Sequence, residues 1–191
     1  MEKNIKQAKR PYQIIKREDL PKESFKEVRL PYPKMDWAVM HHFNDIAKNH
    51  CGPTFITNLA LYFHSQGYVK LLIEGSKEKS FQHLHDQMGN GPIFFTAKKA
   101  RRYFQSRGYN LNFKNVDKIS DLKTSIDQSR PLSLLIYNSL FEWHWVLCVG
   151  YLSNENTTYA RIINAWDNSD ERFYPLNKKS RWFSATAFWI N

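Results

Sequence analysis

The 191-residue chain has no long hydrophobic run, only two cysteines and only seven glycines. No apolar stretch approaches the roughly 20 residues that a membrane-spanning helix requires, so we do not expect a membrane protein. Residues 1–30 are charged and polar, without the apolar centre of a secretory signal. The cytoplasm is therefore the default location, and secretion is expected only if a leader has been removed. Two cysteines cannot form a disulfide framework.

The composition indicates a globular protein with a basic surface. Hydrophobic residues make up 42% and aromatic residues 15%, which is too much for a disordered protein. The net charge of +10 attracts polyanions or simply keeps the protein soluble. In the basic stretch 98–107, Tyr103 and Phe104 are expected on the core-facing side of a helix, which leaves a solvated basic face. Nucleic acid is therefore not an expected partner.

The expected elements are helices first and strands later. Residues 1–35 contain prolines and many charges without a sustained period, and they predict an N-terminal arm ahead of a body at 36–191. The order of elements in the body predicts an α+β fold with a largely antiparallel sheet in the C-terminal half. The spacing of apolar residues predicts helices over 53–66, 77–88, 96–107 (with Thr96 as N-cap) and 120–128, and strands over 132–137, 144–151, 159–165 and 185–190.

The most informative motif is Asn49-His50-Cys51-Gly52-Pro53-Thr54, at the start of the first expected helix. Proline in the first turn costs little, because the N–H that it lacks would have no helical partner there. A sulfur at a helix N-terminus feels the positive end of the helix dipole, which favours a thiolate nucleophile. The alternative is a buried, inert cysteine, and this is the interpretation we favour for Cys148 in its apolar, strand-like run.

A histidine and an asparagine follow on two neighbouring strands. His144 starts one expected strand, and the turn cluster 153–157 folds the chain back so that positions 164–166 lie opposite it. Asn164 and Trp166 are then predicted on the same face as His144. There an amide can hold the imidazole tautomer, and a tryptophan can shield that hydrogen bond from water. The alternatives are an aromatic-belt histidine and a polar strand-end asparagine, and the shared face favours the functional interpretation.

These three segments resemble the papain-like cysteine peptidases. Cys51-Gly52 before a helix is similar to that fold's nucleophile site, His144–Tyr151 to its histidine strand, and Asn164-Ala165-Trp166 to its Asn-Ser-Trp element. The opening at Cys51 looks more like the bacterial branch near the bacteriocin-leader (double-glycine) peptidases and streptopain. The resemblance covers roughly residues 36–190, and it implies an N-terminal helical lobe and a C-terminal antiparallel sheet lobe with a cleft between them.

The resemblance also implies a role for each residue. Cys51 would be the nucleophile, and His144 would be the general base and then the acid that protonates the leaving amine. Asn164 would orient the imidazole, and Trp166 would shield it. The backbone N–H of Cys51 would contribute to the oxyanion hole.

The sequence departs from this family at the oxyanion position. Six residues before the nucleophile, where the family usually has a glutamine, this chain has Asp45, and an ionised carboxylate repels an oxyanion. Asn44 and Asn49 are the amides that can replace it, and Asn44 is preferred because Asn49 is expected to shape the start of the helix. Loss of one oxyanion donor costs about 100- to 1,000-fold in rate, so the departure concerns turnover and not the fold.

The sequence thus predicts a thiol-dependent hydrolase, a peptidase whose substrate is a peptide or protein and which cleaves peptide or isopeptide bonds. A catalytically weak or inactive peptide-binding module and an acyl or amide transferase using the same thiolate are the alternatives, because the site determines the attack and not the acceptor. No cofactor and no metal is expected, because the histidines lack supporting carboxylates or thiolates at ligand spacing.

Overall fold

The computed structural model describes residues 13–45, 49–91, 94–139, 142–176 and 182–191. This part of the chain contains four α-helices and one eight-stranded antiparallel sheet, which confirms the α+β class. The helices are α1 (Cys51–Ser65), α2 (Lys77–Met88), α3 (Thr96–Ser106) and α4 (Ile119–Asp127). The strands are β1 (Ile15–Lys16), β2 (Lys26–Arg29), β3 (Leu111–Asn115), β4 (Leu132–Ser139), β5 (Glu142–Ser153), β6 (Thr158–Ile163), β7 (Arg172–Pro175) and β8 (Trp182–Ile190).

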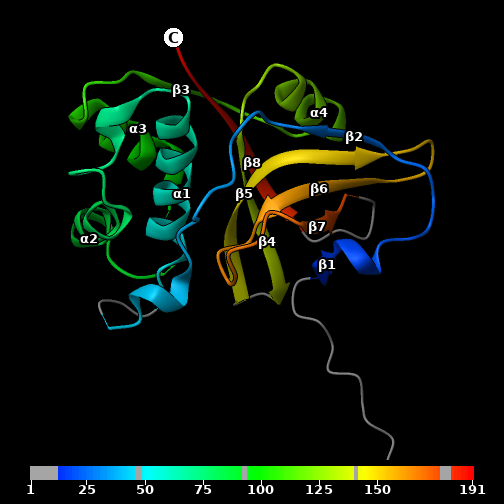
Figure 1. Ribbon diagram of the computed structural model, residues 1–191, viewed down its shortest axis with the longest axis horizontal. Coiled ribbons are helices and arrows are strands. Elements are labelled where there is room, and N and C mark those ends of the chain that lie inside the picture. Colours follow the sequence, from blue (N-terminus) through cyan, green and yellow to red (C-terminus); the bar gives the residue numbers. More distant parts are fainter. Residues whose placement is uncertain (1–12, 46–48, 92–93, 140–141, 177–181) are drawn as a thin grey trace, which may run out of the picture.

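The sheet follows the order β1-β7-β6-β5-β4-β8-β3, and β2 pairs with β5 outside this path. Along one edge of β5, β4 pairs with the first half and β2 with the second half, while β6 pairs along the other edge. Helices α1, α2 and α3 lie together on one side of the sheet, and α4 lies apart from them, near β2 (Figure 1). Within the described ranges, no helix combines the length and the apolar character needed to cross a bilayer.

Most of the expected elements occur with small shifts at their ends. The stretches 53–66, 77–88 and 120–128 correspond to α1, α2 and α4. The expectation for Thr96 is wrong: Thr96 is the first residue of α3, and the N-cap position belongs to Phe95, whose backbone is left-handed with φ of 56°. Strands β1, β2, β3 and β7 are new relative to the sequence prediction, because they are too short to show a sustained alternation of apolar and polar residues.

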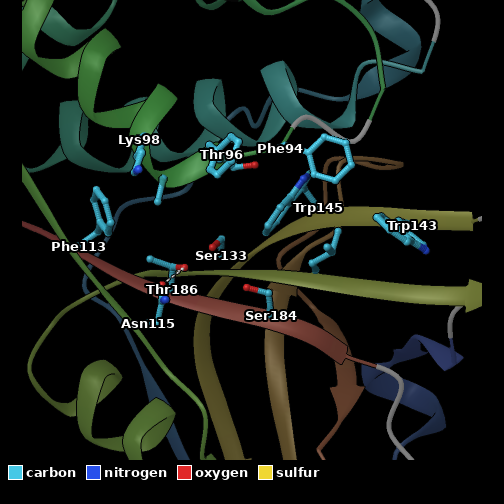
Figure 2. A pocket seen from close by; sticks show the side chains of 13 residues that line it. Phe94, Thr96, Lys98, Phe113, Asn115, Ser133, Trp143, Trp145, Ser184 and Thr186 are labelled. Atoms are coloured by element: carbon cyan, nitrogen blue, oxygen red, sulfur yellow. Dashed lines mark hydrogen bonds between the residues drawn. The ribbon is translucent and has the colours of Figure 1, made fainter.

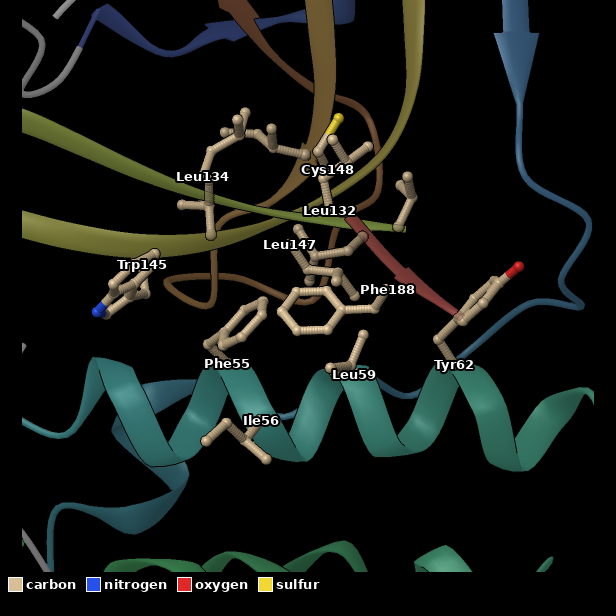
Figure 3. Packing of buried hydrophobic residues seen from close by; sticks show 14 of the residues in the cluster. Phe55, Ile56, Leu59, Tyr62, Leu132, Leu134, Trp145, Leu147, Cys148 and Phe188 are labelled. Carbon is tan, nitrogen blue, oxygen red and sulfur yellow. The ribbon is translucent and has the colours of Figure 1, made fainter. Parts of the chain in front are cut away.

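Helix α1 is the centre of the hydrophobic core, since every residue in the range Cys51–Phe63 is buried. Phe55 points from α1 to the sheet, where it meets Trp145 of β5 and Phe188 of β8 (Figure 3). The centroid of the Phe55 ring lies 6.0 Å from that of Trp145 and 6.1 Å from that of Phe188. Burial of a large apolar side chain contributes about 1.5–3 kcal/mol, so the start of α1 is held firmly against β5.

The N-terminal strands are tied to the sheet by an ion-pair network around one buried arginine. The Arg161 side chain in β6 is only 3% exposed, and it pairs with Glu27 of β2 at 2.6 Å and with Glu171. Its Nε also donates to the Asp170 carbonyl at 2.8 Å. Arg17, directly after β1, pairs with the same two glutamates. Because a buried charge is tolerated only when it is paired and hydrogen-bonded, this network fixes β2 to the loop that follows β6.

Strand β2 approaches β5 very closely at Gly150. A Cβ atom at this position would lie 2.5 Å from the Val28 carbonyl oxygen of β2. A side chain would therefore push the two strands apart, and the pairing of Arg29 with Gly150 depends on glycine.

Candidate active site

Cys51 is the first residue of α1, and the local backbone explains why the helix begins there. Asn49 has a left-handed backbone with φ of 54°, which turns the chain, and His50 takes the N-cap position. The backbone N–H and the hydroxyl of Thr54 both donate to the His50 carbonyl, at 3.1 and 2.9 Å. Pro53 lies in the first turn, where its missing N–H has no helical partner to lose. The sulfur is therefore at the positive end of α1.

A two-step hydrogen-bond bridge connects the start of α1 to the turn that follows β6. The buried His50 ring donates from Nε2 to the Met40 carbonyl at 2.8 Å. The Met40 N–H then donates to the Ala165 carbonyl at 2.8 Å. The bridge therefore joins the residue before Cys51 to the residue after Asn164.

His144 is buried in β5, with 3% of its surface exposed, and its ring is held on two sides. Its Nε2 lies 2.6 Å from the backbone carbonyl oxygen of Asn164. Because a carbonyl only accepts, Nε2 carries the proton and Nδ1 is the basic nitrogen. The Trp166 ring stacks on the imidazole, with centroids 4.2 Å apart and planes 12° from parallel. Burial lowers the pKa of His144 to about 4, although the bond to Asn164 opposes the shift, so the imidazole is neutral at pH 7.

The Asn164 side chain shapes the turn in which it lies. Its Oδ1 accepts from the backbone N–H groups of Trp166 at 2.9 Å and Asp167 at 3.3 Å. Ala165, which lies between Asn164 and Trp166, has a left-handed backbone with φ of 60°. The His144 ring donates to the backbone carbonyl of Asn164, and not to its side-chain amide as the sequence predicted.

The hairpin register explains how Trp166 comes to lie over the histidine. In the pairing of β5 with β6, the register shifts by one residue between Cys148 and Gly150. Strand β6 ends at Ile163, before the predicted end at 165. Continuing the register from the Cys148 side places Trp166 opposite His144, which agrees with their stacked rings.

The Cys51 sulfur lies beside the peptide bond that follows His144. Burial raises the pKa of Cys51, and hydrogen bonding from the backbone N–H groups of Trp145, Gly52 and Cys51 itself opposes this rise. The net direction is upward, so the resting sulfur is a thiol. The stabilisation of a thiolate expected at a helix N-terminus is present, but burial, which leaves Cys51 only 5% exposed, outweighs it.

The three candidates for a side-chain oxyanion donor are all exposed, unlike Cys51. Asn44 follows the short 3₁₀ helix η3 (Met40–Phe43), and Asp45 comes next. Asn49 combines its left-handed backbone with a carbonyl that accepts from the Gly91 N–H. Of the three, Asn49 is the one with a visible part in shaping the start of α1.

Two further histidines, both in α2, have ordinary hydrogen-bond partners. His85 is hydrogen-bonded to Asn90 at 3.0 Å, and His83 to Gln87 at 2.9 Å. Among the residues that the structure describes, no group of three or more histidine, cysteine, aspartate or glutamate side chains is arranged to hold a metal ion.

A cavity of about 480 Å³ lies between the N-terminal end of α3 and the sheet (Figure 2). Trp143 and Trp145, on either side of His144 in the sequence, both line it. The sequence analysis missed this cavity because its residues come from β3, β4, β5, β8 and the start of α3. The alternation of tryptophan and histidine in β5 is the signal that could have indicated it, because alternate residues of a strand point to opposite faces.

Comparison with known proteins identifies the fold. No protein-family model and no curated protein sequence matches this chain. Among solved structures, it is similar to a candidate C39-like peptidase from Bacillus anthracis, with a TM-score of 0.54 and 12% sequence identity over 87% of this chain and 98% of that one. At this identity the likeness concerns the fold, and the chain therefore has a fold like that of a C39-like peptidase.

Proposed function

We propose that this protein is a cysteine peptidase that cleaves peptide or isopeptide bonds with Cys51 as nucleophile and His144 as base. The observation that carries the proposal is the position of the Cys51 sulfur, at the start of α1 and beside the backbone N–H of Trp145. The residue before Trp145 is His144, whose Nε2 is hydrogen-bonded to the Asn164 carbonyl. The fold shared with a candidate C39-like peptidase supports the same chemistry.

The proposed first step starts from a neutral pair. As the Cys51 sulfur attacks the substrate carbonyl, its proton passes to Nδ1 of His144, and the carbonyl oxygen takes up the negative charge. The backbone N–H of Cys51 is proposed to stabilise that oxygen, with Asn44 as the side-chain candidate. His144 then returns the proton to the leaving amine, which leaves an acyl group on the sulfur. Water, activated by the same nitrogen, releases the acid and restores the thiol.

Asn164 and Trp166 are proposed to hold the imidazole during these steps. The Asn164 carbonyl keeps the proton on Nε2, so that Nδ1 stays the basic atom. The Trp166 ring covers one face of the imidazole and excludes water from it. Asn164 would therefore act through its backbone, and its side chain through the turn that positions this backbone.

We also propose that α1–α3 form one lobe and the sheet the other, with the substrate lying where they meet. Of the N-terminal arm 1–35, residues 1–12 lie outside the described residues, and the segment 13–35 is proposed to brace the body at 36–191 rather than to fill this cleft. The pairing of β2 with the second half of β5, at Gly150–Ser153, supports this arrangement, because His144 lies in the first half of the same strand.

The test combines a covalent probe with a search for cleavage. A peptide vinyl sulfone forms a thioether with an activated cysteine, and intact mass and peptide mapping locate the adduct. Wild type is expected to react at Cys51, and His144→Ala is expected to react at least 10-fold more slowly, since a positioned base contributes about 10²–10⁴-fold. Cleavage of a mixed peptide library by the wild type is followed by mass spectrometry, with Cys51→Ala as the blank.

Cys148→Ala is the matched control, because this second cysteine is fully buried and burial raises its pKa to about 12. It should react and cleave like the wild type. Equal labelling rates in wild type and His144→Ala, together with no cleavage above the Cys51→Ala blank, would refute the proposal. Peptides that bind without being cleaved would instead identify a binding module.

A further inference from the structure

The cavity under α3 has two kinds of surface. Its walls are apolar and aromatic, from Phe94, Phe95, Leu135 and Trp143. Its floor is polar, because Ser133, Asn115, Ser184 and Thr186 project from neighbouring strands toward it (Figure 2). The strand register explains this floor: Ser133 pairs with Thr186, and Thr186 also pairs with Asn115, and directly paired residues share a face of the sheet.

The mouth of the cavity is unusually apolar for a protein surface. Phe94 is 70% exposed and Phe95 is 74% exposed, and they are followed by Lys98 at the rim. Exposed apolar groups with polar neighbours mark places where another molecule is bound. Phe95 also occupies the N-cap position of α3 with a left-handed backbone, so its ring is displayed by the start of a helix and not by a free loop.

One wall of the cavity holds a hydrogen-bond donor without a partner. The Trp145 side chain is 8% exposed, and its indole Nε1 is buried with no acceptor among the residues that the structure describes. A buried donor without an acceptor costs about 1–3 kcal/mol, so such groups are rare, and an acceptor from water or a ligand would satisfy this one. Trp145 is also the residue whose backbone N–H lies at the Cys51 sulfur, so one residue contributes both to this wall and to the surroundings of the proposed nucleophile.

We propose that this cavity is the specificity pocket of the peptidase and that it binds a tyrosine residue of the substrate, on one side of the bond that is cleaved. The inference rests on the proposed function, because it assigns the substrate of that site. A tyrosine supplies an aromatic ring for the walls, a phenol for the hydroxyl and amide floor, and a carbonyl oxygen that the indole N–H of Trp145 can bind.

Size and polarity exclude other occupants. An apolar cavity of about 150 Å³ already admits a benzene ring, so a cavity of about 480 Å³ has room for a phenol and the adjoining backbone. Glycine would leave it empty. The Thr186 hydroxyl already donates to Asn115 Oδ1 at 3.4 Å. A phenylalanine or a fatty acyl chain would cover the hydroxyls of Ser133 and Ser184 without hydrogen-bonding to them, and burial of an unpaired polar group is unfavourable.

The first experiment measures kcat/KM for a set of peptides that differ at one position. Tyrosine, phenylalanine, leucine and glycine are placed in turn at each of the two residues on either side of the cleaved bond. Tyrosine is expected to exceed glycine by about 100-fold and phenylalanine by about 10-fold at one of these positions. Ser133→Ala and Ser184→Ala remove floor hydroxyls with little change of shape, and each should reduce the preference for tyrosine over phenylalanine.

A cavity-filling pair provides the matched control. Ser184→Phe puts a ring into the pocket and should abolish the preference for tyrosine, which brings kcat/KM for the tyrosine and glycine peptides together. Ser120→Phe adds the same ring on the exposed side of α4 and should change neither. If the wild type cleaves the tyrosine and glycine peptides with equal kcat/KM, this inference is overturned and the proposed function stays intact. Faster deacylation of a fatty acyl thioester than of any peptide would also overturn it.

A second readout does not depend on turnover. In Cys51→Ala, the indole N–H resonance of Trp145, assigned by its loss in Trp145→Phe, is followed by NMR while N-acetyl-tyrosinamide is added. A saturable shift that is larger than with N-acetyl-phenylalaninamide is expected. If this shift occurs although the wild type cleaves no peptide, the peptidase proposal fails and the pocket assignment stands as a binding site. No shift with either amide overturns the pocket assignment.

Discussion

The two cysteines of this chain are both buried, yet their surroundings differ in every other respect. Cys148 lies in the middle of β5, is fully buried, and donates from its sulfur to the Gly150 carbonyl at 3.4 Å. Cys51 lies at the start of a helix, and backbone N–H groups point at its sulfur. Burial raises the pKa of both thiols. The comparison shows that burial does not distinguish a structural cysteine from a candidate nucleophile, whereas the backbone N–H groups around the sulfur do.

The largest expected effect separates the two cysteines directly. Cys51→Ala removes the nucleophile and should lower kcat/KM by about 10⁴-fold or more. Cys148→Ala should keep kcat/KM within about 2-fold and lower the free energy of unfolding by about 1 kcal/mol. Peptide hydrolysis and urea unfolding measure the two quantities on the same variants. If Cys148→Ala lost as much activity as Cys51→Ala, the contrast between the two sites would be wrong.

The next effect concerns the base beside Cys51. His144 has a pKa of about 4 in the folded protein, against about 6.5 in an unfolded chain. Between these values the unfolded state binds more protons, so the stabilisation is fully present above pH 6.5 and is lost as the pH falls toward 4. The loss amounts to about 3 kcal/mol.

Urea unfolding at pH 7 and at pH 4.5 measures this loss, and the His144→Gln variant is the control for every other group that titrates in the same range. The wild type should lose more stability than His144→Gln over this interval. Identical losses in the two proteins would show that His144 is not buried as a neutral base, and that the surroundings of Cys51 are more polar than those of Cys148.

A smaller effect tests how Asn164 contributes. Asn164→Ala removes the Oδ1 that accepts from Trp166 and Asp167, and a lost turn of this kind should lower kcat by about 10-fold. Asn164→Asp keeps an oxygen in the same place and should stay within about 3-fold of the wild type. Equal losses in the two variants would instead assign the function to the amide nitrogen.

The smallest expected effect tests the bridge behind Cys51. His50→Phe removes the donor to the Met40 carbonyl and should lower kcat about 3-fold with little change in KM, because the helix start shifts relative to Ala165. His50→Gln can donate in the same direction and should restore most of kcat. His64→Phe, at the other end of α1, is the control and should leave kcat unchanged. A His50→Phe variant with wild-type kcat would show that the bridge does not position the sulfur.

Local patterns predicted much of the fold and the order of the candidate residues. The apolar spacing of α1 and the Gly-Pro start beside Cys51 are local signals, and so is the turn between β5 and β6. The register shift between Cys148 and Gly150 could not be predicted, because it accompanies the close approach of β2 at Gly150. The same holds for the burial of His144 and the cavity under α3, which depend on strands distant in the sequence.

The ion pairs of Arg161 have a practical consequence for any shortened version of this chain. A protein trimmed to begin at Asp36 would lose Glu27, and Arg161 would keep its pairing with Glu171 while one of its buried guanidinium donors lost its acceptor. The loop that begins at Asn164 would also lose the contacts of Arg29 and Tyr32 with Asp170, but it would keep the hydrogen bond from the Met40 N–H to the Ala165 carbonyl. The N-terminal strand β2 thus helps to hold the loop whose first residue contacts His144, so the choice of an expression boundary also affects the surroundings of the proposed base.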